Sequence, residues 1–592
     1  MEKNPLKFLA HAFKRGIGFF WGVVRKVGKA WKLILKILAI LVLISVVGAG
    51  AFYIKVISYN PPVPATERGV FFEELLPKDT LAVFSFNPSD ASQRSIINNL
   101  FETVLQDKAS AALPFLASKF LSEEKDIATL AKFVDLIKTD LRGVVAITNE
   151  KDKSSTLIML ALKDAEGMKA ILKKGTVLVE EKENILVQYE GMYAGVIKDV
   201  FFWADSEEAA RGISSTLKHP WAALTNSSEF KNAMKSANAP FSGYVFINTN
   251  EPGKNTLFPT IGTSGSEAGA ISNAVAFYRA AQDGIYLDTI SFAKNKSGKV
   301  DENVSASIYK KVSAEKLVAF IEMHGLGNLL LEQMVAEVKA NSEDKKVSKE
   351  DLENQAYEQL GQMIGFDFKA EIMPILNGNF AFSVHNLGSN IPAITLTLDV
   401  SGQAQAADAF VKKLDLKIAQ LISFANLTFK TNEKDQILTL EKLQTAKSGG
   451  LVKIYFDRIS KNIADIPLFK LLPSPMEIAY GITDDGLLFF STTPDFGKIF
   501  TTTNTIDGSE LFAQAKASGA DASTLFILNS STLLELAQRF VDSTKKAGTF
   551  SKDDEAIYEI IKKHVLPVKS VVQLSKNDGA NIKGKIFVKI VK

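Results

Sequence analysis

The sequence predicts an α+β protein, with an N-terminal single transmembrane helix followed by two tandem copies of an antiparallel-sheet α+β domain. Three observations lead to this prediction. Residues 37–54 form an uncharged apolar run, several blocks of similar sequence recur in the same order, and many strand-like segments are joined by tight turns. Closely joined strands must be antiparallel, because a parallel pair needs a long crossover connection. The chain of 592 residues is long enough for more than one hydrophobic core.

Residues 1–32 predict a basic amphipathic helix. Apolar residues recur at steps of three and four, and lysines and arginines occupy much of the rest. The apolar positions are Leu6, Leu9, Phe13, Ile17, Phe20, Val24, Val27 and Trp31. Such a helix lies in the headgroup layer and is attracted to anionic lipid, so we expect a cytoplasmic, interfacial position. An ordinary packed helix is the alternative.

Residues 33–57 predict a transmembrane helix. The uncharged part, 37–54, covers about 27 Å of a roughly 30 Å hydrocarbon core, and apolar residues extend it at both ends. Because the basic cluster precedes it, the positive-inside rule puts the N-terminus in the cytoplasm and the bulk of the chain outside. A buried core helix and a cleaved signal peptide, with Ala49-Gly50-Ala51 as its cleavage site, are the alternatives. We expect an uncleaved signal anchor in a single-pass protein of the cell membrane.

Residues 58–69, SYNPPVPATERG, predict a proline-rich stalk. Consecutive prolines favour an extended and rather stiff polyproline II conformation. The stalk would hold the folded part away from the bilayer.

The remainder divides into two predicted copies, repeat 1 at 70–312 and repeat 2 at 313–592. Matching blocks keep their order, and their separation grows from 236 residues (79 to 315) to 282 (290 to 572). An insertion within about 414–475 of repeat 2 accounts for the increase. The matched pairs are 79–87 with 315–323, 143–148 with 378–384, 155–162 with 392–400, 195–213 with 481–500, 231–248 with 512–529, and 290–312 with 572–591.

Turn signals define the strands within each copy. Asp283-Gly284, Asp485-Gly486 and Asp578-Gly579 are dipeptides typical of hairpin turns, because they accept a positive φ. The segments 195–213 and 481–500 each predict a strand, a tight turn, an aromatic-rich strand and then a helix. We therefore expect each copy to place its helices against one face of an antiparallel sheet.

No motif carries a recognisable chemistry. The chain has no cysteine, which excludes disulfides and thiolate ligands, and its net charge of +3 gives no reason to expect nucleic-acid binding. GANIKGKI at 579–586 lacks the hydroxyl of a phosphate-binding loop, and IGTSGSEAGAIS at 261–272 lacks the order of a nucleophile elbow. Histidines are scattered and do not form a metal motif. They are His11, His219, His324, His385 and His564.

The sequence therefore assigns no catalytic, cofactor-binding or metal-binding residue and no cofactor, and the binding residues are unknown. Phenylalanine is abundant, at 40 against 12 tyrosines. Well-filled cores explain this, and an apolar groove for lipid or peptide is the alternative.

The phrase ELLPKDTLAVFSFNPSD at 74–90, soon after a membrane anchor, resembles the opening of bacterial membrane-anchored proteins of the domain of unknown function 3352 family. The resemblance implies an extracytoplasmic, duplicated α+β region over about 70–592. It implies no catalytic residues.

We therefore expect a membrane-anchored extracytoplasmic protein of the bacterial envelope with a binding or structural role rather than an enzyme. Its partners would be the lipid bilayer, through 33–57 and the basic helix, and an envelope protein, lipid or cell-wall ligand. One alternative is an envelope-acting hydrolase with a site between the two repeats. Another is a lipid-binding or carrier ectodomain.

Overall fold

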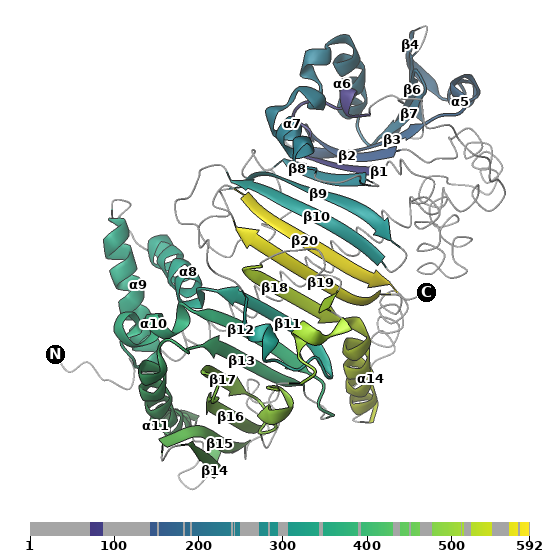
Figure 1. The fold of residues 1–592 in the computed structure, drawn as a ribbon. Helices are drawn as coiled ribbons and strands as arrows, with labels where there is room; N and C mark the ends of the chain where they lie inside the picture. The colour runs from purple at the N-terminus through teal and green to yellow at the C-terminus, as the bar shows by residue number, and fades with distance from the viewer. Residues whose placement is uncertain are drawn as a thin grey trace. The chain divides into compact units, whose positions relative to one another are not determined.

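The protein is described by a computed structural model (Figure 1). The described residues are 72–86, 143–150, 153–181, 184–189, 192–237, 241, 243–248, 271–281, 284–293, 306–341, 347–388, 392–429, 438–448, 451–461, 476–501, 503–510, 512–513, 522–546, 568–577 and 581–590. The predicted N-terminal helix, membrane span and stalk, at 1–69, lie outside them. Within these ranges no helix is both long and apolar enough to cross a membrane.

The chain forms two compact units. The first unit contains the described residues of 72–293 together with those of 577–590, and the second unit contains those of 306–576. The predicted copies, 70–312 and 313–592, differ from these units in one respect above all. The last strand of the chain belongs to the first unit.

The first unit is built on a fully antiparallel sheet. Its strand order is β20–β10–β9–β8–β1–β2–β3–β7–β6–β5–β4. The strands are β1 (Ala82–Phe86), β2 (Gly143–Glu150), β3 (Lys153–Ala161), β4 (Thr176–Glu181), β5 (Asn184–Tyr189), β6 (Met192–Ile197), β7 (Val200–Ala204), β8 (Gly243–Asn248), β9 (Ile271–Ala281), β10 (Gly284–Ala293) and β20 (Asn581–Ile590).

Predicted tight turns are confirmed in this sheet. β6 and β7 are joined through Lys198 and Asp199, with Lys198 at φ +53°, and Ile197 faces Val200 across the hairpin. β9 and β10 pair from Ala281 and Gly284 outward, so their link is equally short.

Helices lie on both faces of the first sheet, which corrects the expectation of one covered face. The helices are α5 (Ala165–Leu172), α6 (Glu207–Lys218) and α7 (Ser228–Lys235), with short 3-10 turns η1 (Phe72–Glu74), η3 (Pro220–Ala222) and η4 (Leu224–Asn226). α6 and α7 pack on the face that carries Phe202, whereas α5 packs on the face that carries Phe201. Both faces of β5–β7 are apolar, so each face needs a cover.

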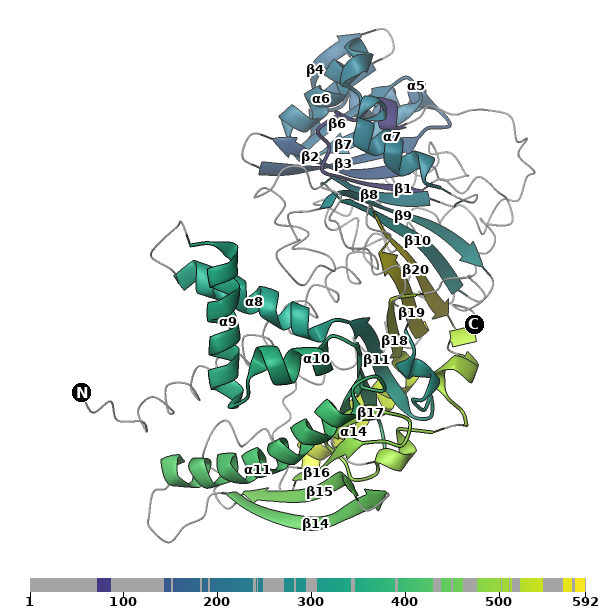
Figure 2. The same cartoon turned by 60° about the vertical axis from the view of Figure 1, so that its left-hand side comes forward.

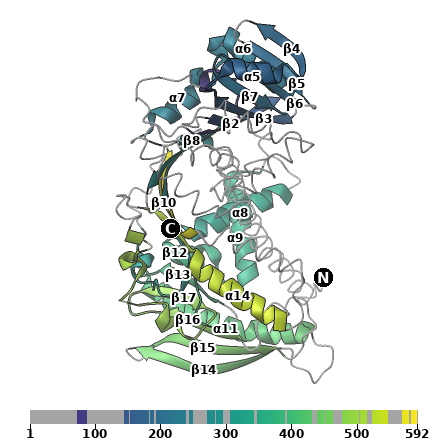
Figure 3. The same cartoon turned by 90° about the vertical axis from the view of Figure 1, so that its right-hand side faces the viewer.

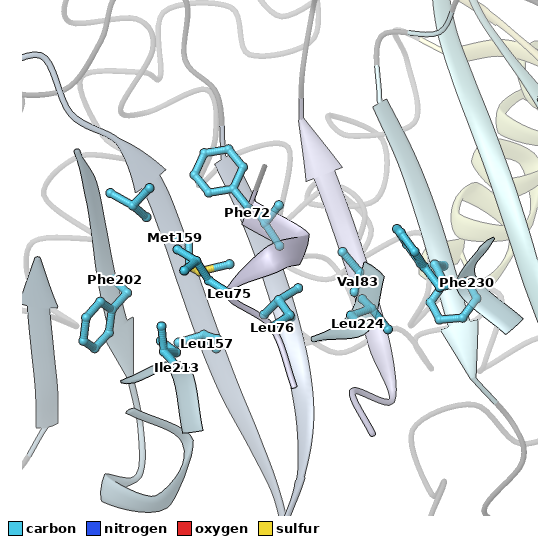
Figure 4. Close-up of a cluster of buried hydrophobic side chains, with 14 of the residues drawn as sticks. Phe72, Leu75, Leu76, Val83, Leu157, Met159, Phe202, Ile213, Leu224 and Phe230 are labelled. Atoms are coloured by element: carbon cyan, nitrogen blue, oxygen red, sulfur yellow. The ribbon is translucent and has the colours of Figure 1, made fainter. Parts of the chain in front are cut away.

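The main core of the first unit lies under α6 and α7. Leu157, Met159 and Phe202 extend from β3 and β7 toward Ile213 of α6. Figure 4 shows Leu76 and Leu224 from two loops in the same cluster, and both are fully buried. The Leu224 N–H donates to the Leu76 carbonyl at 2.8 Å, which ties these loops together over the sheet.

The second unit has an antiparallel sheet with the order β19–β18–β11–β12–β13–β17–β16–β15–β14. Counted in chain order, these nine strands pair in the same sequence as β9–β8–β1–β2–β3–β7–β6–β5–β4 of the first unit. They are β11 (Leu317–His324), β12 (Asn379–His385), β13 (Ala393–Asp399), β14 (Leu438–Ser448), β15 (Leu451–Lys461), β16 (Met476–Ile482), β17 (Leu487–Ser491), β18 (Thr524–Asn529) and β19 (Val568–Asn577).

Helices of the second unit are longer. They are α8 (Leu326–Asn341), α9 (Lys349–Ile364), the π-helix η7 (Phe368–Ile372), α10 (Met373–Leu376), α11 (Ala404–Phe429) and α14 (Ser530–Lys546), with 3-10 turns η6 (Ile308–Lys310), η8 (Phe496–Lys498) and η9 (Ile506–Gly508). Figures 2 and 3 show α11 lying along β15 and β16. The predicted insertion at 414–475 corresponds to the length of α11 and of the β14–β15 hairpin.

The helix predicted after the second aromatic-rich strand is wrong. Only the 3-10 turn η8 follows β17, whereas α6 follows β7. Pro494 and Gly497 fall within this segment, and both residues disfavour an α-helix interior.

Gly195 of β6 gives a direct test of the first sheet. A side-chain carbon there would overlap with the Phe202 ring and the Ile185 carbonyl oxygen, so Gly195→Ala should destabilise the first unit by about 1–3 kcal/mol. The measurement is the denaturant midpoint of the full chain followed by tryptophan fluorescence. Gly402→Ala is the matched control, because nothing lies within 4 Å of that position. Equal midpoints for the two variants would contradict this packing.

Candidate binding groove

A groove of about 270 Å³ lies in the first unit, between α6 and the end of the sheet formed by β4, β5 and β6. Figures 2 and 3 both show α6 beside β4. Its apolar lining comes from Leu186 and Ile197, which are buried, and from Val179. Its polar lining is described below. The groove is thus apolar at its base and polar along its sides.

Helix α6 is positioned by its own sequence. The Ser206 hydroxyl accepts from the Ala209 N–H at 3.1 Å and caps the helix N-terminus, and Glu207 and Glu208 occupy the first turn. Buried Ala209 and Ile213 face the sheet. The opposite flank presents a polar stripe at helical spacing to the groove, made of Arg211, Ser214, Ser215 and Lys218.

An ion pair links the two sides of the groove. Lys218 Nζ of α6 lies 3.0 Å from Glu181 Oε1 of β4. The Lys218 hydrogen bond and charge hold the pKa of Glu181 below its usual value, and the Asn184 amide adds to this effect. Arg211 is paired with Glu207 at 2.6 Å. Both pairs are about half exposed, so they contribute little to stability and can exchange partners with a ligand.

Asn184 has an unused acceptor in the groove lining. Its Oδ1 atom is shielded from solvent and has no hydrogen-bond partner among the described residues. A buried acceptor without a donor costs about 1–3 kcal/mol. A ligand N–H or O–H group would satisfy it.

An exposed tryptophan stands beyond the groove. Trp221 is 74% exposed, and its ring centroid lies 5.7 Å from that of His219, which lines the groove. The segment that carries it is held firmly: Lys78 N–H donates to the Ala222 carbonyl at 2.8 Å, and Asn226 donates to the Pro220 carbonyl at 2.8 Å. Trp221 is therefore a rigid, solvent-facing aromatic surface.

The histidines of the sequence are not brought together. His219 lines the groove of the first unit. In the second unit, His324 Nδ1 lies 3.1 Å from Asn379 Oδ1, and buried His385 contacts the Ser313 carbonyl at 3.0 Å through Nε2. Burial lowers the pKa of His385. His11 and His564 lie outside the described residues, within which no group of three potential metal ligands occurs.

The second unit contains a buried polar cluster without a groove around it. The Tyr480 hydroxyl lies 2.8 Å from Asp457 Oδ2 and 2.7 Å from Asp415 Oδ1, and Lys442 contacts both aspartates. Burial, and then the hydrogen bond to Asp457, raise the pKa of Tyr480, so its hydroxyl stays a donor. The cluster links α11 to β14, β15 and β16, which indicates a structural role.

A second buried pair lies in the first unit. The Tyr244 hydroxyl donates to Glu73, whose side chain comes from η1. Burial raises the pKa of Glu73, and its hydrogen bond to Tyr244 opposes this only in part. The pair connects η1 to β8 beneath the core of Figure 4.

Sequence reasoning did not find the groove residues. The polar stripe of α6 is readable as one flank of an amphipathic helix, but any solvated helix has such a flank. Asn184, Glu181 and Trp221 lie on three different elements, and only the strand pairing brings the first two together, since Glu181 faces Asn184 across β4–β5.

The structure defines an α+β protein with large antiparallel sheets and a small polar groove. A family model with the description "Protein of unknown function (DUF3352)" matches residues 37–560. The chain therefore belongs to the domain of unknown function 3352 family, and the predicted family is confirmed.

No curated protein matches the chain. Among solved structures, crystal forms I and III of TP0453 are similar at 11% sequence identity. The matches cover 38% and 39% of this chain and 80% and 84% of that chain, with TM-scores of 0.23 and 0.24. Scores this low do not establish a common fold.

Glu73 predicts a pH dependence of stability. Its folded pKa is raised, so the folded chain binds more protons than the unfolded chain above the ordinary value of 4.5. The free energy of unfolding should therefore fall as pH rises from about 4.5, and level off above the raised pKa. Glu73→Gln should remove this fall. The measurement is denaturant unfolding at pH 5 and pH 8, with the exposed neighbour changed as Glu74→Gln for control. An unchanged slope in Glu73→Gln would contradict the assignment.

Proposed function

We propose that the protein is a single-pass, membrane-anchored binding protein of the bacterial envelope, with its folded units outside the membrane and the groove of α6 as its ligand site. The groove carries this proposal. It combines an apolar base, exchangeable charges, an unused buried acceptor and a rigid exposed aromatic residue, which is the composition of a small-ligand site.

The location is supported by the sequence. The apolar run at 37–54 is long enough for a span, and the family match begins at residue 37. Lysines and arginines precede the run, which favours a cytoplasmic N-terminus. The lipid bilayer is thus one proposed partner, and an envelope component is the other.

We also infer that the two units are copies of one ancestral domain. The shared order of nine strands supports this, and so do equivalent loop contacts. Leu224 N–H donates to Leu76 O at 2.8 Å in the first unit, and Ile506 N–H donates to Val312 O at 2.9 Å in the second. These pairs differ by 236 and 282 residues, the two separations found in the sequence.

Cysteine labelling tests location and occupancy together, because the natural chain has no cysteine. Ser215→Cys places a thiol in the groove, and Leu416→Cys places one on the second unit, at a residue 65% exposed. A membrane-impermeant maleimide should label both in intact spheroplasts. Occupied by its ligand, the groove should make Ser215→Cys react several-fold more slowly in cells than in purified protein.

Lys3→Cys is the topological control and should react only after lysis. Leu416→Cys is the control for rate and should react equally in cells and in purified protein. Labelling of Leu416→Cys only after lysis would contradict the extracytoplasmic location. An equal rate for Ser215→Cys in both preparations would contradict a ligand-filled groove.

Lipid binding is a second candidate, favoured by one observation. Phe382 of β12 and Ile394 of β13 are 41% and 44% exposed. Val384 faces Ile394 and Phe382 faces Leu396, so both exposed residues lie on one apolar sheet face. Exposed apolar side chains gathered in this way indicate an interaction surface.

The second candidate predicts lipid loss from a polar variant. Protein carrying Phe382→Ser and Ile394→Ser should copurify with at least about twofold less lipid than the natural chain, because apolar contact area is lost. Mass spectrometry of extracted lipid measures the ratio, with Leu416→Ser as the exposed control. An unchanged lipid-to-protein ratio would rule this candidate out.

A further inference from the structure

We propose that the groove binds an acetamido group of an N-acetylated amino-sugar chain, and that Trp221 carries a neighbouring sugar ring. The inference rests on the proposed function and names the ligand class of the same site.

The volume of the groove sets the size of the bound group. At about 270 Å³ it lies just below the ~300–1,000 Å³ of typical ligand pockets. It holds one compact group of a larger ligand and leaves the remainder outside. A sugar chain has this form, because each ring offers one small substituent to a pocket.

The lining selects the chemistry of that group. Leu186, Ile197 and Val179 provide an apolar base, which suits a methyl group. Asn184 Oδ1 lacks a donor, which an amide N–H supplies at hydrogen-bond distance. An acetamido group carries a methyl and an N–H two bonds apart from a common carbonyl carbon, so it meets both demands.

The sides of the groove suit the hydroxyls that surround such a group. Ser214, Ser215 and Lys218 offer donors from one helix flank, and Glu181 offers acceptors from the sheet. Lys218 and Glu181 already neutralise one another, so a ligand without net charge leaves no unpaired ion. A neutral, hydroxyl-rich chain is favoured over an anion.

Trp221 extends the site beyond the groove. An indole ring that is 74% exposed on a segment held by backbone hydrogen bonds loses little entropy when a flat apolar surface packs on it. The C–H face of a pyranose ring is such a surface. His219 lies between Trp221 and the groove, so an extended chain contacts both.

The test compares two tetrasaccharides that differ only in the acetamido group. Chitotetraose carries it, and cellotetraose has a hydroxyl in its place. Full-length protein in detergent is titrated with each by calorimetry. We expect chitotetraose to bind at least about tenfold more tightly, because a hydrogen bond and a buried methyl together contribute more than 1.4 kcal/mol.

Two variants assign the contacts. Asn184→Leu should bring the two affinities to within about twofold, since it removes the acceptor. Trp221→Ala should weaken both tetrasaccharides by about tenfold and preserve their ratio, because it removes the stacking surface alone. It changes an exposed residue, so the fold is retained. Leu416→Ala, on the second unit, is the control and should bind as the natural chain does.

Absence of chitotetraose binding at millimolar concentration, or equal affinity for both tetrasaccharides, would overturn the proposal. A selectivity that survives in Asn184→Leu would overturn the role of the groove. Slow labelling of Ser215→Cys in cells, combined with absence of chitotetraose binding, would leave the proposed binding function standing with a different ligand. Fast labelling in cells would instead contradict that function itself.

Discussion

The close approach of Phe202 to Gly195 is the contact on which the first unit depends. Gly195 of β6 pairs with Leu186 on one side and with Phe202 on the other, and the missing side chain leaves room for the Phe202 ring. That ring joins the core under α6, and Leu186 beside it forms part of the groove base. Core, helix position and groove thus share one strand alignment.

The sheet architecture could be predicted because short turns leave only antiparallel pairing open. The details were less accessible. A bulge between Leu317 and Ala319 shifts the register, so an ungapped comparison matches half-buried Phe84 with buried Phe320, although Val83 occupies the core of the first unit. The matched block at 290–312 likewise begins in β10 while its partner begins in β19, which takes the place of β9 in the strand order. Local similarity does not reveal such shifts.

The groove could not be predicted because it depends on a difference between similar segments. After β7 the chain forms α6, which presents Arg211, Ser215 and Lys218 to the sheet end, whereas after β17 it forms only η8. Both segments follow a Gly-containing hairpin, at Gly195 and Gly481, and read alike up to the end of the second strand. The feature that distinguishes the units is therefore the presence of one helix, and the ligand site follows from it.

Hydrogen–deuterium exchange of the full-length protein, with and without saturating chitotetraose, tests the central claim most directly. We predict slower exchange in two separate segments, 181–186 and 211–219, because ligand in the groove contacts both, and unchanged exchange along 404–429 of the second unit. Slower exchange confined to the second unit, or absent from both groove segments, would contradict the account.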